Sequence, residues 1–234
     1  MQISGDKHNS REALLAAAHK LFIEKGYESV STRELAEEAG VNLGAIQYHF
    51  GSKGQLFVET MKTLMEGEWP THIYALLDQP TDSPVQAAGN FAIFVRAQLE
   101  DLLADDKPQP CKMMVRELFT PTSNDTQMFE ALVSTVTENF IRPVHTSMSA
   151  LFRLIAPGRE TAEYQSAVHN TFSQCFFYLT HGPFIERLRG VNIREVAFLN
   201  QAAGQITKSV LRELCCSESL ITQAAAATSS RQEI

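Results

Sequence analysis

The sequence predicts an all-α protein, and three observations lead to this prediction. Apolar residues recur at the three- and four-residue spacing of amphipathic helices along most of the 234 residues. Glycine and proline separate these stretches where helices would end. No segment shows the two-residue alternation of a strand. We expect a three-helix domain over residues 1–60, a larger helical domain over residues 61–220 and a disordered tail over residues 221–234.

The first predicted helix covers residues 10–25, with Ser10 as its N-cap and Gly26 as the left-handed residue after its end. Its apolar stripe consists of Leu14, Ala17, Ala18, Leu21 and Phe22. Residues 1–9 are polar, and we expect them to be mobile because nothing in them can anchor to a core.

The stretch after this helix predicts two short helices joined by a tight turn. Ser31 and Glu34 have the spacing of a capping box at the start of the first, and Gly40 ends it. Asn42 can cap the second, over residues 43–49. Two helices joined by a short turn with glycine form a helix-turn-helix, whose second helix enters the major groove of DNA.

Side chains of the second short helix suit contact with DNA. Gln47 can donate to and accept from an adenine edge, and the methyl group of Ala45 can touch a thymine methyl. Tyr48, His49 and Lys53 carry hydrogen-bonding or cationic groups suited to phosphates. We therefore expect double-stranded DNA, in the form of an operator, to be a partner.

This part of the chain resembles the DNA-binding domain of the TetR family of bacterial transcriptional regulators over residues 10–60. The resemblance is carried by the run S-T-R-E-L-A-E-E-A-G-V-N-L-G-A-I-Q-Y-H-F-G-S-K. It implies phosphate contacts for Thr32, Tyr48 and Lys53 and base contacts for Gly44, Ala45 and Gln47. Many members have an aromatic residue at the position of Gln47, so the resemblance leaves the operator sequence open. The predicted DNA-binding residues are Thr32, Arg33, Asn42, Leu43, Gly44, Ala45, Gln47, Tyr48, His49 and Lys53.

Longer helices follow in the larger domain. They are expected over residues 52–69, 85–103, 111–119, 126–155, 160–180 and 193–215. Ser52 and Gln55 form a second capping box at the start of the first of these. Pro143 is expected to kink or divide its helix, and Pro183 to end the helix that begins at residue 160.

The last two predicted helices carry apolar residues on more than one stripe, so each requires a partner beyond its own core. We expect a homodimer in which they pair with their copies as a four-helix bundle. The predicted dimer residues are Phe177, Phe198, Ala202 and Ile206. The same arrangement is usual in the TetR family.

The second domain resembles the regulators grouped around CecR in the runs C-K-M-M-V-R-E-L, F-I-R-P and Q-C-F-F-Y. This resemblance implies a site for a small-molecule effector whose identity it does not give. The candidate ligand-binding residues are Met61, Met65, Trp69, Phe91, Phe94, Met113, Arg116, Phe119, Phe172 and Phe176. Plain core is the commoner role for the apolar members, and an internal ion pair with Glu117 or a solvated face is the commoner role for Arg116.

Charge and motifs limit the remaining classes of function. The net charge is −7, and residues 1–62 hold seven basic and eight acidic side chains, so the predicted DNA-binding domain is not basic. This low charge leaves open a helical enzyme or a protein-binding adaptor with a structural helix-turn-helix. We expect no cofactor and no metal, since His145 and His169 lack ligand spacing, and a buried inert thiol at Cys175. We predict a ligand-responsive repressor in the cytoplasm, without enzymatic activity or a membrane partner.

Overall fold

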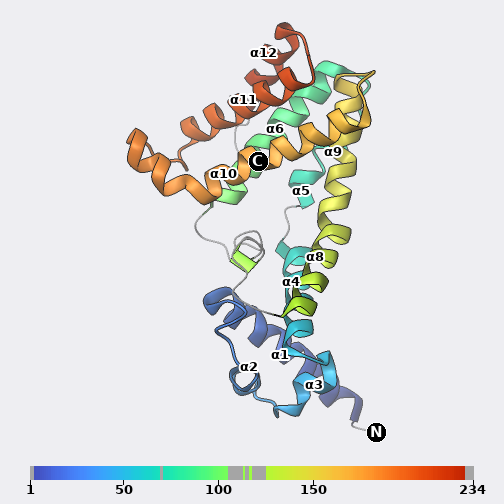
Figure 1. Ribbon diagram of the computed structural model, residues 1–234, viewed down its shortest axis with the longest axis vertical. Helices are drawn as coiled ribbons and strands as arrows, with labels where there is room; N and C mark the ends of the chain where they lie inside the picture. Colours follow the sequence, from blue (N-terminus) through green and yellow to red (C-terminus); the bar gives the residue numbers. More distant parts are fainter. Residues whose placement is uncertain (1–2, 69–70, 105–112, 114–115, 118–124, 230–234) are drawn as a thin grey trace. The chain divides into compact units, whose positions relative to one another are not determined.

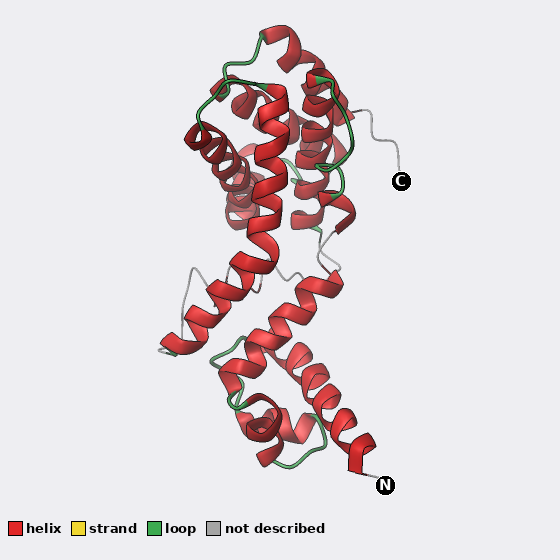
Figure 2. Cartoon of the chain, turned by 90° about the vertical axis from the view of Figure 1, so that its right-hand side faces the viewer, coloured by secondary structure: helices red, strands yellow, loops and turns green. Residues whose placement is uncertain are grey.

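The computed structural model describes residues 3–68, 71–104, 113, 116–117 and 125–229. In these ranges every regular element is a helix, which confirms the all-α prediction (Figures 1 and 2). The chain forms two compact units, one made of Met1–Trp69 with Pro108–Ile141 and the other of Pro70–Lys107 with Arg142–Ile234. This division differs from a single boundary at residue 60 because the helix over Thr126–Val136 packs with the N-terminal helices.

The first unit consists of the N-terminal helices and one later helix that packs along them. Its elements are α1 (Ile3–Lys25), α2 (Thr32–Glu38), α3 (Gly44–Phe50), α4 (Lys53–Glu68), α8 (Thr126–Val136) and a π-helical turn (Thr137–Ile141). Helix α4 packs against α1, α3 and α8, and Figure 1 shows α8 beside α4. The apolar core of this unit includes Leu14, Phe22, Leu35, Ile46, Phe57 and Met61.

Helix α1 begins at Ile3, seven residues before the predicted N-cap at Ser10, so the predicted start of this helix is wrong. The apolar face from Leu14 to Phe22 is buried and fixes the helix. Extending a formed helix is far less costly than nucleating one, so the polar residues before Ser10 can continue it without a core of their own.

The prediction that Pro143 divides its helix is confirmed. A π-helical turn over Thr137–Ile141 lies directly before α9 (Arg142–Ile155), which contains Pro143 at its second position. Proline has no N–H to donate and its ring needs space near the carbonyl four residues earlier, which favours a local wider turn. The division between the two units falls at the same place, between Ile141 and Arg142.

The second unit surrounds α6 (Pro84–Leu103), which packs against the helices that follow it. Its other elements are α5 (Thr71–Tyr74), α9, α10 (Thr161–Arg189), α11 (Val196–Glu213), α12 (Glu218–Ala226) and a 3-10 turn (Ala227–Ser229). The Oγ of Ser83 accepts the N–H of Gln86, and Pro84 occupies the first turn of α6. The Nε of Arg96 donates to Oδ1 of Asn200 at 2.7 Å, which joins α6 to α11.

Helix α10 continues through Pro183, so the predicted break at residues 181–183 is wrong. A proline inside a helix costs about 3 kcal/mol, and local packing offsets this cost. Gly182 lies against Ile193, where a Cβ atom on the glycine would stand 2.5 Å from Cδ1. The N–H of Ile193 donates to Oε1 of Glu186 at 3.2 Å, which holds the following loop to the helix. The helix instead ends before Gly190, whose φ is +64°.

The predicted disordered tail is also wrong over residues 221–229, because α12 and a 3-10 turn occupy this stretch. The Oγ of Ser217 accepts the N–H of Leu220 and caps α12. Ile221 and Ala224 are buried, and α12 packs against α6 and α11. Alanine is the strongest helix former and its small side chain allows close packing, so an alanine-rich stretch need not be a tail. Residues 230–234 lie outside the described residues.

Candidate nucleic-acid interface

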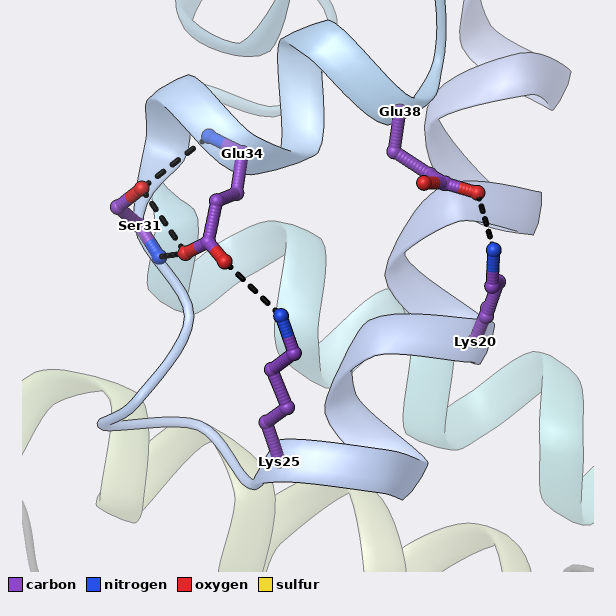
Figure 3. A network of polar contacts seen from close by, with 5 residues as sticks. All are labelled: Lys20, Lys25, Ser31, Glu34 and Glu38. Carbon is purple, nitrogen blue, oxygen red and sulfur yellow. Dashed lines mark hydrogen bonds and ion pairs between the residues drawn. The ribbon is translucent and has the colours of Figure 1, made fainter.

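Helix α2 starts with the predicted capping box, which Figure 3 shows. The Oγ of Ser31 accepts the N–H of Glu34 at 3.1 Å, and the carboxylate of Glu34 accepts the N–H of Ser31 at 3.0 Å. Hydrogen bonds from the Ser31 backbone and from the Lys25 ammonium group lower the pKa of Glu34 to about 2. The start of α2 is therefore fixed by local chemistry, as the sequence predicts.

Two ion pairs join α2 to α1 (Figure 3). The Nζ of Lys25 lies 3.0 Å from Oε1 of Glu34, and the Nζ of Lys20 lies 2.6 Å from Oε1 of Glu38. The hydrogen bond with Glu38 raises the pKa of Lys20. Such exposed pairs add little to stability, but they engage cations that could otherwise meet phosphates.

The same pairing extends along the described residues 10–66, where each lysine and arginine has a partner. The pairs with carboxylates are Arg11–Glu59, Lys20–Glu38, Lys25–Glu34, Arg33–Glu37 and Lys62–Glu66. The remaining cation, Lys53, is bonded to backbone carbonyls. Each cation of this region is thus held beside a carboxylate or a backbone carbonyl.

The turn between α2 and α3 has Gly40 with φ of +66°, which confirms the predicted end of α2. The predicted N-cap at Asn42 is wrong, because Leu43 occupies the cap position and α3 has no side-chain cap hydrogen bond. Ala45 and Ile46 are both buried and form the inner face of α3. The methyl group of Ala45 therefore faces the core. The expected contact of this methyl group with a thymine is wrong.

The outer face of α3 carries exposed side chains. Leu43 is 56% exposed and Tyr48 is 66% exposed, so both side chains are accessible to a partner. Gly44 and Gln47 are exposed beside them, while His49 is half-buried. Thr32, Arg33 and Asn42 are exposed before α3, so seven of the ten predicted DNA-binding residues, all but Ala45, His49 and Lys53, are fully accessible.

Lys53 at the start of α4 is turned into the first unit, and not outward as expected for a phosphate contact. Its Nζ donates to the carbonyl oxygens of Tyr27 and Val30, both at 2.9 Å, and lies 4.1 Å from the centre of the Tyr27 ring. Burial lowers its pKa. The neighbouring N–H of Gln55 donates to Oγ of Ser52 at 3.0 Å, so the hydroxyl half of the second predicted capping box is present.

The predicted ligand-binding residues are divided between the two units. Met61, Met65 and Met113 are buried in the first unit, Phe91 and Phe94 are buried in the second, and Phe172 and Phe176 are half-buried there. Trp69 and Phe119 lie outside the described residues. Burial is compatible both with a role in the core and with the lining of a pocket, so the assignment of these side chains to a ligand site stays a prediction.

Arg116 belongs to the first unit and is bonded within it. Its Nη2 donates to the carbonyl of Phe22 at 2.6 Å, its Nη1 to that of Ile23 at 3.3 Å and its Nε to Glu117 at 3.0 Å. A cation at these carbonyls satisfies the end of a helix. The alternative prediction of an internal ion pair with Glu117 is confirmed, and the role of ligand anchor is not supported.

Three of the four predicted dimer residues are in the core of the second unit. Phe198, Ala202 and Ile206 are buried within it, so their assignment to the interface is wrong. Only Phe177 is accessible, at 49%. Because α10 continues past Pro183, it exposes two residues that the prediction missed, Phe184 and Leu188; their seven- and eleven-residue spacing from Phe177 could have indicated them.

Groups suited to catalysis or metal binding are few in the described part of the chain. The rings of His145 and His169 are 5.4 Å apart, but no three His, Cys, Asp or Glu side chains there could hold a metal ion together. Cys175 is buried and its pKa is raised to about 12, as predicted for an inert thiol. Among these residues no helix has both the length and the apolarity to cross a bilayer.

Comparison with known proteins explains this combination of a helix-turn-helix and a larger helical unit. Residues 14–60 match the model of bacterial regulatory proteins of the tetR family, and residues 87–214 match the C-terminal domain of the HTH-type transcriptional dual regulator CecR. The chain belongs to the TetR family. Both predicted resemblances are thereby confirmed, and TetR-family proteins are transcriptional regulators and not enzymes.

The relatives extend over different parts of the chain. The HTH-type transcriptional repressor AcnR of Corynebacterium efficiens is 46% identical over 56 residues, which are 24% of this chain and 30% of AcnR. CecR of Shigella flexneri is 34% identical over 164 residues, which are 67% of this chain and 66% of CecR. The chain thus spans under a third of the AcnR sequence and about two-thirds of CecR.

Solved TetR-family structures share the fold. NalD, the secondary repressor of the MexAB-OprM multidrug efflux pump in Pseudomonas aeruginosa, has a TM-score of 0.55 and 18% identity. The similarity covers 90% of this chain and 98% of NalD. At this level of identity the likeness extends to architecture alone.

Proposed function

We propose that this TetR-family protein is a ligand-responsive transcriptional repressor that binds an inverted-repeat operator as a homodimer. The observation that carries the proposal is the outer face of α3, where Leu43 and Tyr48 are exposed at 56% and 66% without serving the core. We propose repression and not activation of transcription because AcnR and NalD are named repressors, although CecR is named a dual regulator.

In this function α3 enters the major groove and its exposed residues divide the contacts. Gln47 can form a bidentate pair with an adenine edge, and the adjoining Gly44 lets the backbone come close to the bases. The Tyr48 hydroxyl and the exposed Thr32 hydroxyl are suited to phosphates. Because the nearby cations are paired with carboxylates, we expect these neutral groups to contribute much of the affinity.

A stripe along α10 supports the homodimer. Phe177, His181, Phe184 and Leu188 follow the four-three-four spacing of a helical seam, and all four are exposed. The rings of Phe177 and His181 stack with centres 4.6 Å apart. Leu188 is 84% exposed, and burying a side chain of its size contributes roughly 1.5–3 kcal/mol. A second copy could cover this stripe, and a dimer would place two α3 helices on two half-sites.

Regulation by a small molecule requires different affinities for two states. An effector that binds more tightly when the two α3 helices are wrongly spaced weakens DNA binding by that difference in free energy. The CecR-like C-terminal region is the proposed location of the effector site. A regulator that acts on the chromosome would work in the cytoplasm.

The test is binding of the purified protein to a labelled duplex that covers the DNA upstream of its own gene. We expect the protein to prefer this duplex to a random duplex at fixed salt, and Tyr48→Ala to bind the duplex more weakly while staying folded. A screen of candidate small molecules would then show release of the protein from the duplex. Equal binding to an operator obtained by random-site selection and to random DNA would refute the proposal.

A further inference from the structure

The first unit contains a polar cluster around Tyr27, in the turn between α1 and α2. Tyr27 is only 3% exposed although it lies in a turn. Its N–H donates to Oε1 of Glu117 at 3.2 Å, its hydroxyl donates to Oδ2 of Asp125 at 2.8 Å, and its carbonyl accepts from Nζ of Lys53 at 2.9 Å. Each polar group of this residue is thus bonded, and its ring packs at 5.1 Å against Phe57.

Glu117 brings a negative charge into this cluster. It is 4% exposed, and a buried carboxylate is tolerated only when it is paired and hydrogen-bonded. Its Oε1 accepts from Nε of Arg116 and from the N–H of Tyr27. Gly26 makes the approach possible, since a Cβ atom there would lie 3.2 Å from Nε of Arg116 and 3.4 Å from Oε1 of Glu117. Arg116 and Glu117 therefore hold the end of α1 and the turn after it.

Asp125 performs two tasks with its two oxygens. Oδ1 accepts the N–H of Met128 at 2.9 Å and caps α8, while Oδ2 accepts the Tyr27 hydroxyl. The start of α8 also touches the start of α4, where a Cβ atom on Gly54 would stand 2.9 Å from Cβ of Met128 and 3.1 Å from Oδ2 of Asp125. The absence of a side chain at Gly54 thus permits the close contact between these helices.

These contacts converge on the backbone that flanks the DNA-facing helices. Lys53 bonds the carbonyls of Tyr27 and Val30, and Val30 directly precedes Ser31, the N-cap of α2. Lys53 also lies two residues after Gly51, where α3 ends. The position of Tyr27 therefore sets both the start of α2 and the link between α3 and α4, although Tyr27 itself is buried and cannot touch DNA.

We propose that Tyr27, with Glu117 and Asp125, is a positioning residue for DNA binding. The two carboxylates lie 90 and 98 residues further along the chain, so the affinity of α3 for the operator depends on Glu117 and Asp125 staying bonded to Tyr27. This inference rests on the proposed function. It adds that residues outside the helix-turn-helix, within the first unit, control the geometry of α2 and α3.

Two conservative variants separate positioning from folding. Tyr27→Phe keeps the ring and both backbone hydrogen bonds but removes the donor to Asp125. Asp125→Asn keeps an oxygen for the cap of α8 but removes the charge. Each should lower the fraction of molecules with the binding-competent arrangement, and the apparent Kd rises in inverse proportion to that fraction. We expect operator binding to weaken about three- to tenfold, with affinity for a random duplex unchanged. The double variant should show less than the product of the two effects, since both variants alter the same interaction between Tyr27 and Asp125.

Tyr164→Phe is the matched control. Tyr164 is also buried at 3% exposure, and its hydroxyl donates to the carbonyl of Ala156 at 2.8 Å in the second unit. This variant should keep the ratio of operator to random-duplex affinity of the wild type. The measurement is fluorescence anisotropy with both labelled duplexes, at a temperature where circular dichroism shows all proteins folded.

The outcomes distinguish the inference from the function on which it rests. The inference is supported if the wild type prefers its operator, Tyr27→Phe and Asp125→Asn bind the operator more weakly, and Tyr164→Phe binds it as the wild type does. A selective wild type with unaffected Tyr27 and Asp125 variants, or with an equal loss in Tyr164→Phe, overturns the inference alone. A wild type that does not distinguish its operator from random DNA overturns the proposed function and this inference with it.

Discussion

Replacing Lys53 with methionine tests whether this side chain stabilises the fold or contacts DNA. Methionine keeps the length and much of the packing of the lysine stem but removes its charge. The structure shows two hydrogen bonds from Nζ to carbonyls at 2.9 Å and a cation–π contact with Tyr27. We therefore expect the main effect of Lys53→Met to be on stability.

The size of this effect follows from the contacts of Lys53. A hydrogen bond with a charged partner contributes about 1.5–3 kcal/mol, but removing a half-buried charge also recovers desolvation free energy. A net loss of about 1–2 kcal/mol remains as the expected result. For a chain of this length that loss lowers the melting temperature by about 2–8 °C. Lys62→Met, on the exposed side of the same helix with Glu66 at 3.9 Å, is the control and should change little.

The salt dependence of DNA binding gives the decisive measurement for Lys53. Each phosphate contact contributes about 0.9 to the slope of log K against log salt concentration. If Lys53 stays inward on DNA, the slope for Lys53→Met equals that of the wild type between about 50 and 200 mM salt. A slope reduced by about 1.8 for a dimer would show that Lys53 turns outward to a phosphate, and would refute the reasoning from its present contacts.

Three further predictions concern other exposed or buried side chains. Tyr48→Ala should weaken binding of the dimer to its operator about 25-fold, as for one hydrogen bond of about 1 kcal/mol lost in each protomer, and leave the unfolding free energy within about 0.5 kcal/mol of the wild type in a denaturant titration. Phe184→Glu should give a folded monomer by light scattering, whereas Phe198→Glu should lose about 3 kcal/mol or more of stability because its charge would be buried; a folded monomer from Phe198→Glu would contradict the structure. The pKa of Glu34 is lowered from 4.5 to about 2, so its contribution to stability is complete above about pH 4.5 and is lost as the pH falls through 2. The melting temperatures of wild type and Glu34→Gln should therefore converge as the solution is acidified over this range, and a constant difference would exclude the carboxylate as the cause.

Features that depend on residues close together in the sequence could be predicted from it. The capping box of Ser31 and Glu34, the left-handed Gly40 and the division near Pro143 each follow from chemistry within about four residues. The same reasoning fails where distant packing decides. Pro183 is a helix breaker in isolation, but Ile193 packs against Gly182 and holds the helix together beyond it.

The candidate site shows the same limit. An exposed role for Gln47 or Tyr48 follows from their place on a short amphipathic helix. The inward orientation of Lys53 does not, because it depends on carbonyls of Tyr27 and Val30 more than twenty residues away. The hydrogen bond between Tyr27 and Asp125 joins residues 98 positions apart, and no local pattern indicates it.

The paired cations of the described residues 10–66 have a consequence for how the protein finds its target in a genome. Competing sites on the chromosome retain a regulator through sequence-independent attraction between free cations and phosphates. When Lys20, Lys25 and Arg33 already have carboxylate partners, that attraction is small. We expect few copies to be held on bulk chromosomal DNA, so a low number of molecules per cell could keep the operator occupied. Such a protein would locate its operator mainly by repeated encounters through solution and only briefly by sliding.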